Sequence, residues 1–338
     1  MSDPIGFLGR FPAGAVIDEV QRVPDLMSWI QGIVDEQSVM GQFVLTGSQQ
    51  FDLVAGITQS LAGRAGRLEL LALSVAELNE SGNLADDLET NLFRGGYPAL
   101  YGRDVSVEEW LGNYLATYVE RDVPQLLKVR DLSTFHRFVA MCAARSGQLL
   151  NLTALGSDCG ISTPTAREWL SVLEASYVVS LVAPLNANVT TRLSKSPRLF
   201  FLDSGLMSFL LGIRDPQTHV THISRGPVFE TWVTSEIVKQ GFNDARRTSL
   251  GFLRDKRGRE VDLTLEGGQD LVLIEVKSGR TFACDWIAPI RQWREDLMKG
   301  GDVRVSPVVM YGGDESTMSE GVRLMSWRDL VTGVIGPD

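Results

Sequence analysis

The chain has 338 residues, of which 44% are hydrophobic and 22% are charged, and its formal net charge is −10. This composition is ordinary for a globular protein, the length predicts two to four domains, and the acidic balance argues against a surface coated for nonspecific nucleic-acid binding. No stretch has the length of a membrane span and no signal-peptide pattern opens the chain, so we expect a cytoplasmic protein without a membrane partner. Three separated cysteines predict neither a disulfide framework nor a thiolate zinc site.

Two short apolar segments near the N-terminus predict neighbouring strands. Residues 13–19 end in Asp18 and Glu19, and residues 43–48 end in Ser48. The pair resembles the second half of an AAA+ ATPase core, in which the first acid contacts Mg²⁺ through water, the next activates the attacking water, and a polar residue senses the γ-phosphate. The resemblance assigns these roles to Asp18, Glu19 and Ser48, and it makes Arg64 a candidate to face the nucleotide.

The phosphate-binding loop of such an ATPase is missing from this sequence. No G-x-x-x-x-G-K-[ST] motif occurs, and only about a dozen residues precede the first predicted strand. A parallel sheet without the strand that carries this loop has unpaired edges, which a protein partner or an upstream segment would complete. A start codon assigned too far downstream, a truncated gene and a segment kept for structure alone remain as explanations. In each case we expect this chain alone to bind ATP poorly.

The next part of the chain is predicted to be helical. Apolar residues recur at helical spacing over residues 76–92, 107–119 and 133–144, with a break at 95–98. Within this connector, the charge-rich segment 118–123 indicates a solvated or interdomain face.

A helix-turn-helix follows the connector. Cys159-Gly160-Ile161 predicts the turn, Ser162 the cap of the second helix, and residues 177–182 a strand that completes a winged-helix outline. If the second helix reads DNA, Thr163, Thr165 and Arg167 near its N-terminus would meet the groove. The alternative is a winged helix that only couples domains, because this helix carries a single base-reading cation.

A basic cluster lies between residues 246 and 259, where six arginines and lysines stand against one acid, Asp255. Such a cluster could hold a phosphate backbone. Its candidate nucleic-acid contacts are Arg246, Arg247, Arg254, Lys256 and Arg257. The alternative is a solvated hairpin over residues 254–259 whose charges only face water.

Two strand-like segments after this cluster, residues 260–263 and 273–277, carry charges where apolar residues would be expected. Side chains alternate across a strand, so Glu275 and Lys277 share one face, and Asp262 shares a face with Glu260 and Thr264. If the two strands are neighbours with these faces aligned, two carboxylates and an ammonium converge. The apolar run 271–274 indicates an interior strand, whereas the alternative is a solvated edge strand.

These residue types fit metal-dependent phosphodiester hydrolysis. Mg²⁺ prefers oxygen ligands and lowers the pKa of a bound water, which makes Asp262 and Glu275 the candidate metal ligands. Lys277 could orient that water or steady charge on the phosphate. An aspartate followed thirteen positions later by Glu275-x-Lys277 resembles the PD-(D/E)XK nuclease superfamily, which often adds an acid from an upstream helix. Glu230, on a helix predicted to start at Gly226-Pro227, is the candidate for that acid.

The order of motifs over nearly the whole chain resembles a prokaryotic family of AAA+ ATP-binding proteins with a C-terminal DUF4143 domain. The motifs that carry this resemblance lie at residues 17–24, 45–49, 60–64, 95–98, 118–123, 195–198, 203–206, 229–230 and 260–262. The missing phosphate loop is the departure from the family. The expected fold class is α/β multidomain: a partial AAA+ parallel sheet (1–75), a helical connector (76–130), a winged helix (131–190), a PD-(D/E)XK-like domain (191–312) and a C-terminal segment (313–338).

The leading hypothesis is a Mg²⁺-dependent, DNA-processing nuclease joined to an ATPase remnant. Its catalytic residues would be Glu230, Asp262, Glu275 and Lys277. One alternative is a nucleic-acid or protein binding module whose nuclease-like fold is inactive, and another is an interaction protein that needs a second polypeptide. The sequence does not separate double-stranded, single-stranded or branched DNA from RNA, and it does not fix the oligomeric state.

Overall fold

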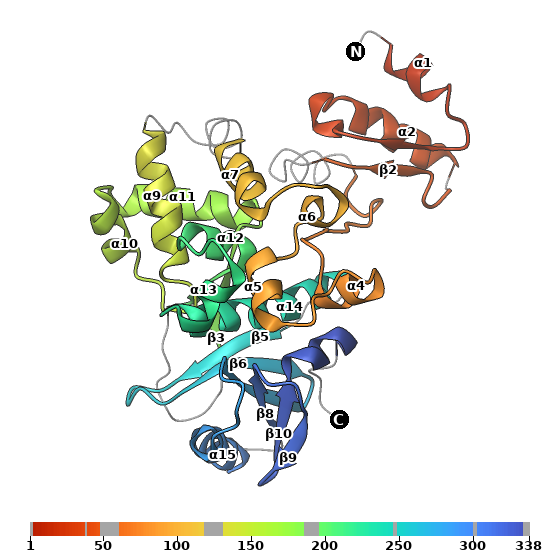
Figure 1. Cartoon of the computed structure of the whole chain (residues 1–338). Coiled ribbons are helices and arrows are strands. Elements are labelled where there is room, and N and C mark those ends of the chain that lie inside the picture. Colours follow the sequence, from red (N-terminus) through yellow and green to blue (C-terminus); the bar gives the residue numbers. More distant parts are fainter. Residues whose placement is uncertain are drawn as a thin grey trace. The chain divides into compact units, whose positions relative to one another are not determined.

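The computed structural model describes residues 3–37, 39–47, 61–117, 131–185, 196–245, 249–299 and 303–333. The chain divides into two compact units, Met1–Glu69 and Leu70–Asp338, and Figure 1 labels their elements. Ser48, Arg246, Arg247 and the segment 118–123 lie outside the described residues. Among the helices that the structure describes, none combines the length and apolar character that a membrane crossing requires.

The first unit contains a small parallel sheet. Strand β1 (Ala15–Ile17) pairs in parallel with β2 (Phe43–Leu45), as the sequence predicted. The helical elements of this unit are α1 (Pro4–Leu8), the 3₁₀ helix η1 (Val20–Arg22) and α2 (Leu26–Gln37). Apolar residues of α2, including Met27 and Ile30, pack with Phe43 and Leu45 into a core of its own. The two strands are shorter than the predicted segments.

The second unit begins with short helices. They are α4 (Val75–Glu80), α5 (Leu88–Arg94), α6 (Ala99–Gly102) and α7 (Val107–Thr117). The single helical segment predicted over residues 76–92 is therefore two helices. Gly82 turns the chain with a φ of 71°, and the Asp87 side chain caps α5 by accepting a hydrogen bond from the Thr90 N–H at 2.8 Å. The apolar periodicity continues across this break and therefore did not reveal it.

Three helices and a strand pair follow. The helices are α9 (Leu132–Ala143), α10 (Leu152–Cys159) and α11 (Thr163–Ala175), and the antiparallel strands are β3 (Val179–Pro184) and β4 (Arg198–Phe201). The predicted turn and cap are confirmed: Gly160 has a left-handed φ of 71°, and the Ser162 side chain accepts from the Thr165 N–H. Phe135 and Phe138 of α9 pack edge to face on Trp169 of α11, with ring centroids 5.1 and 5.4 Å apart.

An eight-stranded mixed sheet runs through the second unit in the order β4-β3-β5-β6-β7-β8-β10-β9. Its remaining strands are β5 (Ser249–Arg254), β6 (Glu260–Gly267), β7 (Asp270–Lys277), β8 (Arg304–Tyr311), β9 (Thr317–Ser319) and β10 (Val322–Ser326). Strand β7 pairs with β6 on one side and β8 on the other, and its residues 271–276 are buried. The prediction of an interior strand is confirmed, and the edge-strand alternative is wrong.

Helices cover both faces of this sheet. Helix α14 (Arg225–Asn243), with α12 (Ser204–Leu210) and α13 (Pro216–Thr221) beside it, packs on the face that presents Val272 and Ile274. Helix α15 (Ile287–Met298), which follows the 3₁₀ turn η3 (Cys284–Trp286), packs on the face that presents Leu271 and Leu273. Between these helices lies a two-sided core of the kind expected for a sheet with parallel pairs. A last 3₁₀ helix, η4 (Trp327–Thr332), ends the described chain.

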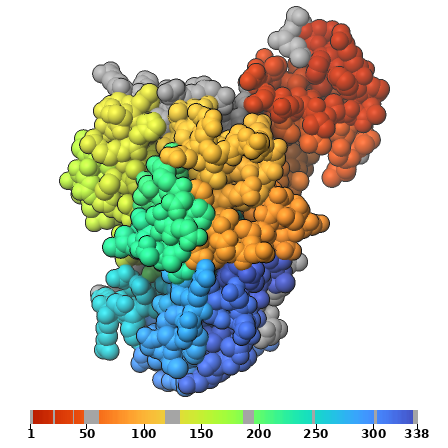
Figure 2. Space-filling model, viewed as in Figure 1, coloured from red at the N-terminus to blue at the C-terminus, as the bar shows by residue number. Residues whose placement is uncertain are grey.

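Within the second unit, the helical segments and the sheet form one continuous surface. Figure 2 shows the orange and green helical parts in contact with the blue sheet part. Strand β3 joins the helices to the sheet by pairing in parallel with β5, through Ala183 and Pro184 opposite Gly251 and Phe252. One sheet thus contains β3 from the predicted winged helix (131–190) and β5 from the predicted PD-(D/E)XK-like domain (191–312).

Candidate functional site

Neighbouring strands bring three of the predicted site residues together. Strands β6 and β7 are antiparallel, with Leu263 opposite Ile274 as the last regular pair before the site. One step beyond this pair, Asp262 Oδ2 accepts a hydrogen bond from the Val276 N–H at 2.9 Å. On β7, Lys277 Nζ donates to Glu275 Oε1 at 2.6 Å. The arrangement that the sequence required, two carboxylates and an ammonium on adjoining strands, is therefore present.

A β-bulge sets the position of Asp262. Gly251 of β5 pairs with Thr264, but Leu253 pairs with Val261, so β6 carries one extra residue between these two pairs. The extra residue shifts the alternation, and Val261 and Leu263 belong to cores on opposite faces of the sheet. The strict alternation that predicted a shared face for Glu260, Asp262 and Thr264 therefore fails at this point. Bulges of this kind redirect side chains and often accompany functional sites.

Glu230 reaches the site from helix α14. Its Oε1 lies 3.2 Å from Arg198 Nη1, and its side chain is 19% exposed. On the other side lies Gly147, which has a φ of 82°; a Cβ there would lie 3.2 Å from Glu230 Oε2. The predicted helical position of this acid is confirmed, because α14 starts at Arg225, next to the Gly226-Pro227 pair that signalled it.

Arg198 is a site residue that the sequence analysis did not assign. Its Nη2 lies 2.9 Å from Glu260 Oε2, and its Nη1 lies 3.8 Å from Asp262 Oδ1. Nη1 also donates to the Asp262 carbonyl at 3.3 Å, and the guanidinium lies 4.8 Å from the centroid of the Phe252 ring. The side chain is only 4% exposed. A charged residue opening the otherwise apolar strand 198–201 is the signal that could have identified it, because buried arginines need partners.

Burial dominates the electrostatics of these acids. Burial, together with the charge of Asp262 as the next cause, raises the pKa of Glu275 to about 7. Burial also raises the pKa of Glu230 well above its usual value, with Asp262 as the next cause, and it raises the pKa of Asp262. Burial lowers the pKa of Lys277, but the Glu275 carboxylate outweighs it, so this pKa is raised. Carboxyl groups shifted by burial and by each other are typical of functional sites, although ion-pair networks show them too.

The donors of this site suit a hard divalent cation. Glu275 Oε2 is buried and has no hydrogen-bond partner among the described atoms. Mg²⁺ is commonly held by one or two carboxylates and several waters, so Asp262 and Glu275 supply enough protein ligands. Among the described residues, no three acidic, histidine or cysteine side chains are grouped closely enough to hold a metal ion by themselves.

Two arginines of the basic cluster, Arg254 and Arg259, form ion pairs within the protein. Arg254 Nη1 lies 3.0 Å from Glu260 Oε2, and Arg259 pairs with Asp255 at 2.8 Å and with Asp296 at 3.0 Å. Lys256 and Arg257 lie at the exposed turn of the hairpin. Of the predicted nucleic-acid contacts on this hairpin, these two are therefore the best placed to meet a ligand.

The predicted contacts on helix α11 differ in their surroundings. Thr165 is half-buried, and its Oγ1 lies 2.7 Å from Ser162 Oγ, so it takes part in capping the helix. Arg167 is exposed. A contact to DNA from this helix would therefore depend mainly on Arg167.

Asp18 and Arg64 of the predicted nucleotide site have partners within the first unit. The Thr46 hydroxyl donates to Asp18 Oδ1, a contact that the sequence analysis missed. Glu19 has a left-handed φ of 52°, an uncommon conformation for a non-glycine residue. Arg64 pairs with Asp35 at 2.5 Å, so an ion pair holds the predicted nucleotide-facing arginine.

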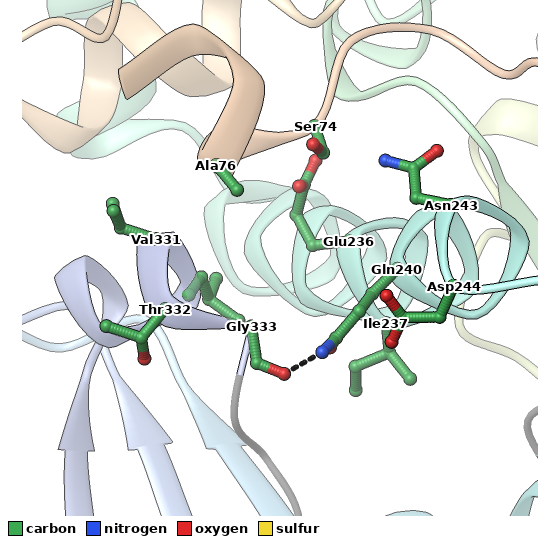
Figure 3. Close-up of a pocket in the computed structure, with 11 residues that line it drawn as sticks. Ser74, Ala76, Glu236, Ile237, Gln240, Asn243, Asp244, Val331, Thr332 and Gly333 are labelled. Atoms are coloured by element: carbon green, nitrogen blue, oxygen red, sulfur yellow. Dashed lines mark hydrogen bonds between the residues drawn. The ribbon is translucent and has the colours of Figure 1, made fainter. Parts of the chain in front are cut away.

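A separate cavity of about 190 Å³ lies between α4, α14 and η4 (Figure 3). Its polar side chains already have partners: Glu236 accepts from the Val75 N–H at 2.7 Å and from Lys239 at 2.8 Å. Gln240 donates to the Gly333 carbonyl. These contacts join helix α14 to the segments on either side, which is a structural role.

Three family models match successive parts of the chain. Residues 7–79 match an AAA domain, residues 85–217 a domain of unknown function (DUF8612), and residues 225–330 a domain of unknown function (DUF4143). Two uncharacterized proteins, Mb2031c of Mycobacterium bovis and Rv2008c of Mycobacterium tuberculosis, are each 31% identical to this chain over 268 residues.

These alignments cover 79% of this chain and 59% of each relative, so the chain spans about three fifths of the length of the curated relatives it matches. A crystal structure of protein VC1899 from Vibrio cholerae aligns with 94% of this chain and 87% of that chain. Its identity is 13% and its TM-score is 0.26, which is too low to carry an argument.

Proposed function

This chain combines an AAA domain with a C-terminal DUF4143 domain, and from that premise we propose that the DUF4143 part is a Mg²⁺-dependent nuclease acting on DNA. The AAA domain makes the chain an ATPase-associated protein, and domains of this type bind nucleotide with Mg²⁺. The nuclease assignment depends on one observation: Asp262, Glu275 and Lys277 converge on two buried, adjoining strands.

The carboxylates of Asp262 and Glu275 would hold the cation, since each is buried and Glu275 Oε2 lacks a partner. Bound there, Mg²⁺ would supply Lewis-acid chemistry and lower the pKa of a water. The Glu275 carboxylate holds Lys277 Nζ beside the same position, where the ammonium can stabilise charge on the phosphate. Attack of water on phosphorus would form one P–O bond, with one proton of that water released to solvent, and would break the bond to the leaving oxygen, which takes a proton from solvent.

DNA would be bound outside this site by exposed cations. Lys256 and Arg257 project from the β5–β6 hairpin, and Arg167 is exposed near the start of α11. The order α9, α10, α11, β3, β4 is that of the proposed winged helix. An isolated antiparallel bridge pairs Leu149, in the segment between α9 and α10, with Arg198 of β4. Phosphate contacts from these cations would give binding that weakens with salt.

A second candidate function is a DNA-binding module whose nuclease-like part does not cut. The observation that favours it is Arg198, which compensates the charges of Glu230, Glu260 and Asp262 without any metal. Buried charges satisfied in this way are compatible with a purely structural network.

Cleavage assays separate the two functions. The purified chain is incubated with labelled linear, single-stranded and branched DNA in Mg²⁺, Mn²⁺ or EDTA. Lys277→Ala and Asp262→Asn are run beside Lys299→Ala, which removes a 74% exposed lysine at the C-terminal cap of α15.

We expect metal-dependent cutting that the two site variants abolish and Lys299→Ala retains. DNA binding without cutting under every condition would exclude the nuclease and support the binding module. Cutting that persists in Asp262→Asn would show that the activity belongs to another site or another protein.

A further inference from the structure

We propose that the Arg198 guanidinium occupies the cation position of the DUF4143 site, so that a divalent cation binds there only by displacing it. This inference rests on the proposed metal ligands Asp262 and Glu275. It concerns metal binding, which can be measured whether or not the protein cuts DNA.

One guanidinium contacts three carboxylates. Arg198 Nη1 lies 3.2 Å from Glu230 Oε1 and 3.8 Å from Asp262 Oδ1. Its Nη2 lies 2.9 Å from Glu260 Oε2. Because the arginine side chain is only 4% exposed, its charge must be balanced by these acids rather than by water. Arg198 thus provides the compensation that a bound cation would otherwise supply.

The Asp262 carboxylate oxygen paired with Arg198 is the one that a metal would need. Asp262 Oδ2 accepts from the Val276 N–H, which leaves Oδ1 as the carboxylate oxygen available to a cation, and Oδ1 lies 3.8 Å from Arg198 Nη1. On the opposite strand, Glu275 Oε1 is taken by Lys277, and Oε2 has no partner among the described atoms. A cation bound to Asp262 Oδ1 and Glu275 Oε2 would lie beside Arg198 Nη1. The bound cation and the neighbouring Arg198 guanidinium are both positive, so they would repel each other strongly in a buried site.

The guanidinium is held incompletely, which makes its displacement feasible. Arg198 Nε is buried and has no hydrogen-bond partner among the described atoms. The Asp262 contact at 3.8 Å is an ion pair beyond hydrogen-bond distance. The guanidinium therefore pairs closely with Glu230 and Glu260, while Asp262 keeps an oxygen that a stronger cation can take.

Arg198 belongs to a different matched segment from the acids. It lies in the DUF8612 match, whereas Glu230 and Asp262 lie in the DUF4143 match. Its backbone is fixed by pairing, opposite Val182 of β3 and bridged to Leu149. The position of the β3–β4 strand pair therefore determines whether the guanidinium can reach the acids. Through Arg198, one segment would control cation access to the other.

Calorimetric titration with Mn²⁺ tests the inference directly. The variants are Arg198→Met, which keeps an apolar stem over Phe252 and removes the charge, and Arg254→Met as the matched control. Arg254 also pairs with Glu260, at 3.0 Å, but no ion pair joins it to Glu230 or Asp262 among the described residues. We expect Arg198→Met to bind Mn²⁺ at least about tenfold more tightly than the wild type, and Arg254→Met to stay within about twofold.

Unfolding free energies measured in EDTA and in Mn²⁺ test the inference even if Arg198→Met is unstable. Arg198→Met leaves buried acids without their cation, so it should be destabilised in EDTA and recover in Mn²⁺ by more than the wild type gains. Arg198→Lys keeps a positive charge on a shorter side chain, so its Mn²⁺ affinity should lie between those of the wild type and Arg198→Met. In Arg198→Met combined with Asp262→Asn, the gain should disappear.

Unchanged Mn²⁺ affinity in both Arg198 variants would overturn the inference, as would an Arg198→Met protein that Mn²⁺ fails to stabilise. Tighter Mn²⁺ binding without cleavage of any DNA would support the inference and exclude the nuclease. Cleavage by the wild type with unchanged metal affinity in the variants would leave the nuclease in place and reject the role of Arg198.

Discussion

The buried imidazole of His219 should make the second unit sensitive to acid. His219 lies on α13 with no exposed surface, its Nε2 is 3.1 Å from Ser208 Oγ, and its Nδ1 has no hydrogen-bond partner among the described atoms. Burial, together with the nearby His222 as the next cause, lowers the pKa of His219 to about 4. The folded protein therefore holds this ring neutral, while the unfolded chain protonates it below the ordinary pKa of about 6.5.

The sign and size of the effect follow from this difference. Between pH 6.5 and 4 the unfolded state binds a proton that the folded state refuses, so the unfolding free energy falls as the pH falls. The stabilisation is fully present above about pH 6.5. At about 1.4 kcal/mol per pKa unit, the loss from His219 is about 2 kcal/mol at pH 5 and about 3 kcal/mol at pH 4.

Urea unfolding followed by tryptophan fluorescence at pH 7 and pH 5 measures this loss. His219→Gln, which cannot take up a proton, should lose about 2 kcal/mol less than the wild type between these two values. His136→Gln, at a half-buried position on α9, is the control and should keep the wild-type difference. An equal pH dependence in His219→Gln and wild type would refute the assignment of acid sensitivity to this ring.

Three further results are expected. Gly147→Ala should destabilise the protein by about 1–3 kcal/mol in urea unfolding, because alanine is strained at a φ of 82° and its Cβ would lie 3.2 Å from Glu230 Oε2; an unchanged midpoint would contradict that geometry. Glu275→Gln should raise thermal stability in EDTA at pH 8, because burial and the charge of Asp262 disfavour the ionised carboxylate of the wild type. This gain should shrink as the pH falls below about 7, where the folded wild type takes up the proton, towards the ordinary pKa of a glutamate. A gain that stays constant with pH would contradict the raised pKa. Replacing Lys256 and Arg257 together by alanine should weaken DNA binding and reduce the steepness of its salt dependence by about 2 in a log–log plot, measured by fluorescence anisotropy; an unchanged slope would place the contacts elsewhere.

The local features of this chain could be predicted because neighbouring residues determine them. The cap at Ser162 and the turn at Gly160 depend on backbone conformations that the residue type selects within a few positions. The interior position of β7 could be inferred from its continuous apolar run, because a strand buried on both faces loses its polar alternation. The charges of Glu275 and Lys277 on such a strand then marked the site.

The site itself was decided by contacts between residues far apart in the chain. Arg198 meets Glu230 and Glu260 across 32 and 62 positions, and no local pattern encodes that meeting. Likewise, Asp296 of α15 neutralises Arg259 across 37 positions, which removes one charge from the basic cluster.

The sequence by itself therefore determined the secondary elements around the site and the residue types of Asp262, Glu275 and Lys277. Only the tertiary structure decided how those charges are balanced. The β6 bulge that positions Asp262 arises from pairing with β5, and the Arg198 contact arises from the joining of β3 to the same sheet. Both depend on the packing of distant strands, whereas propensity and periodicity act only over a few neighbouring residues.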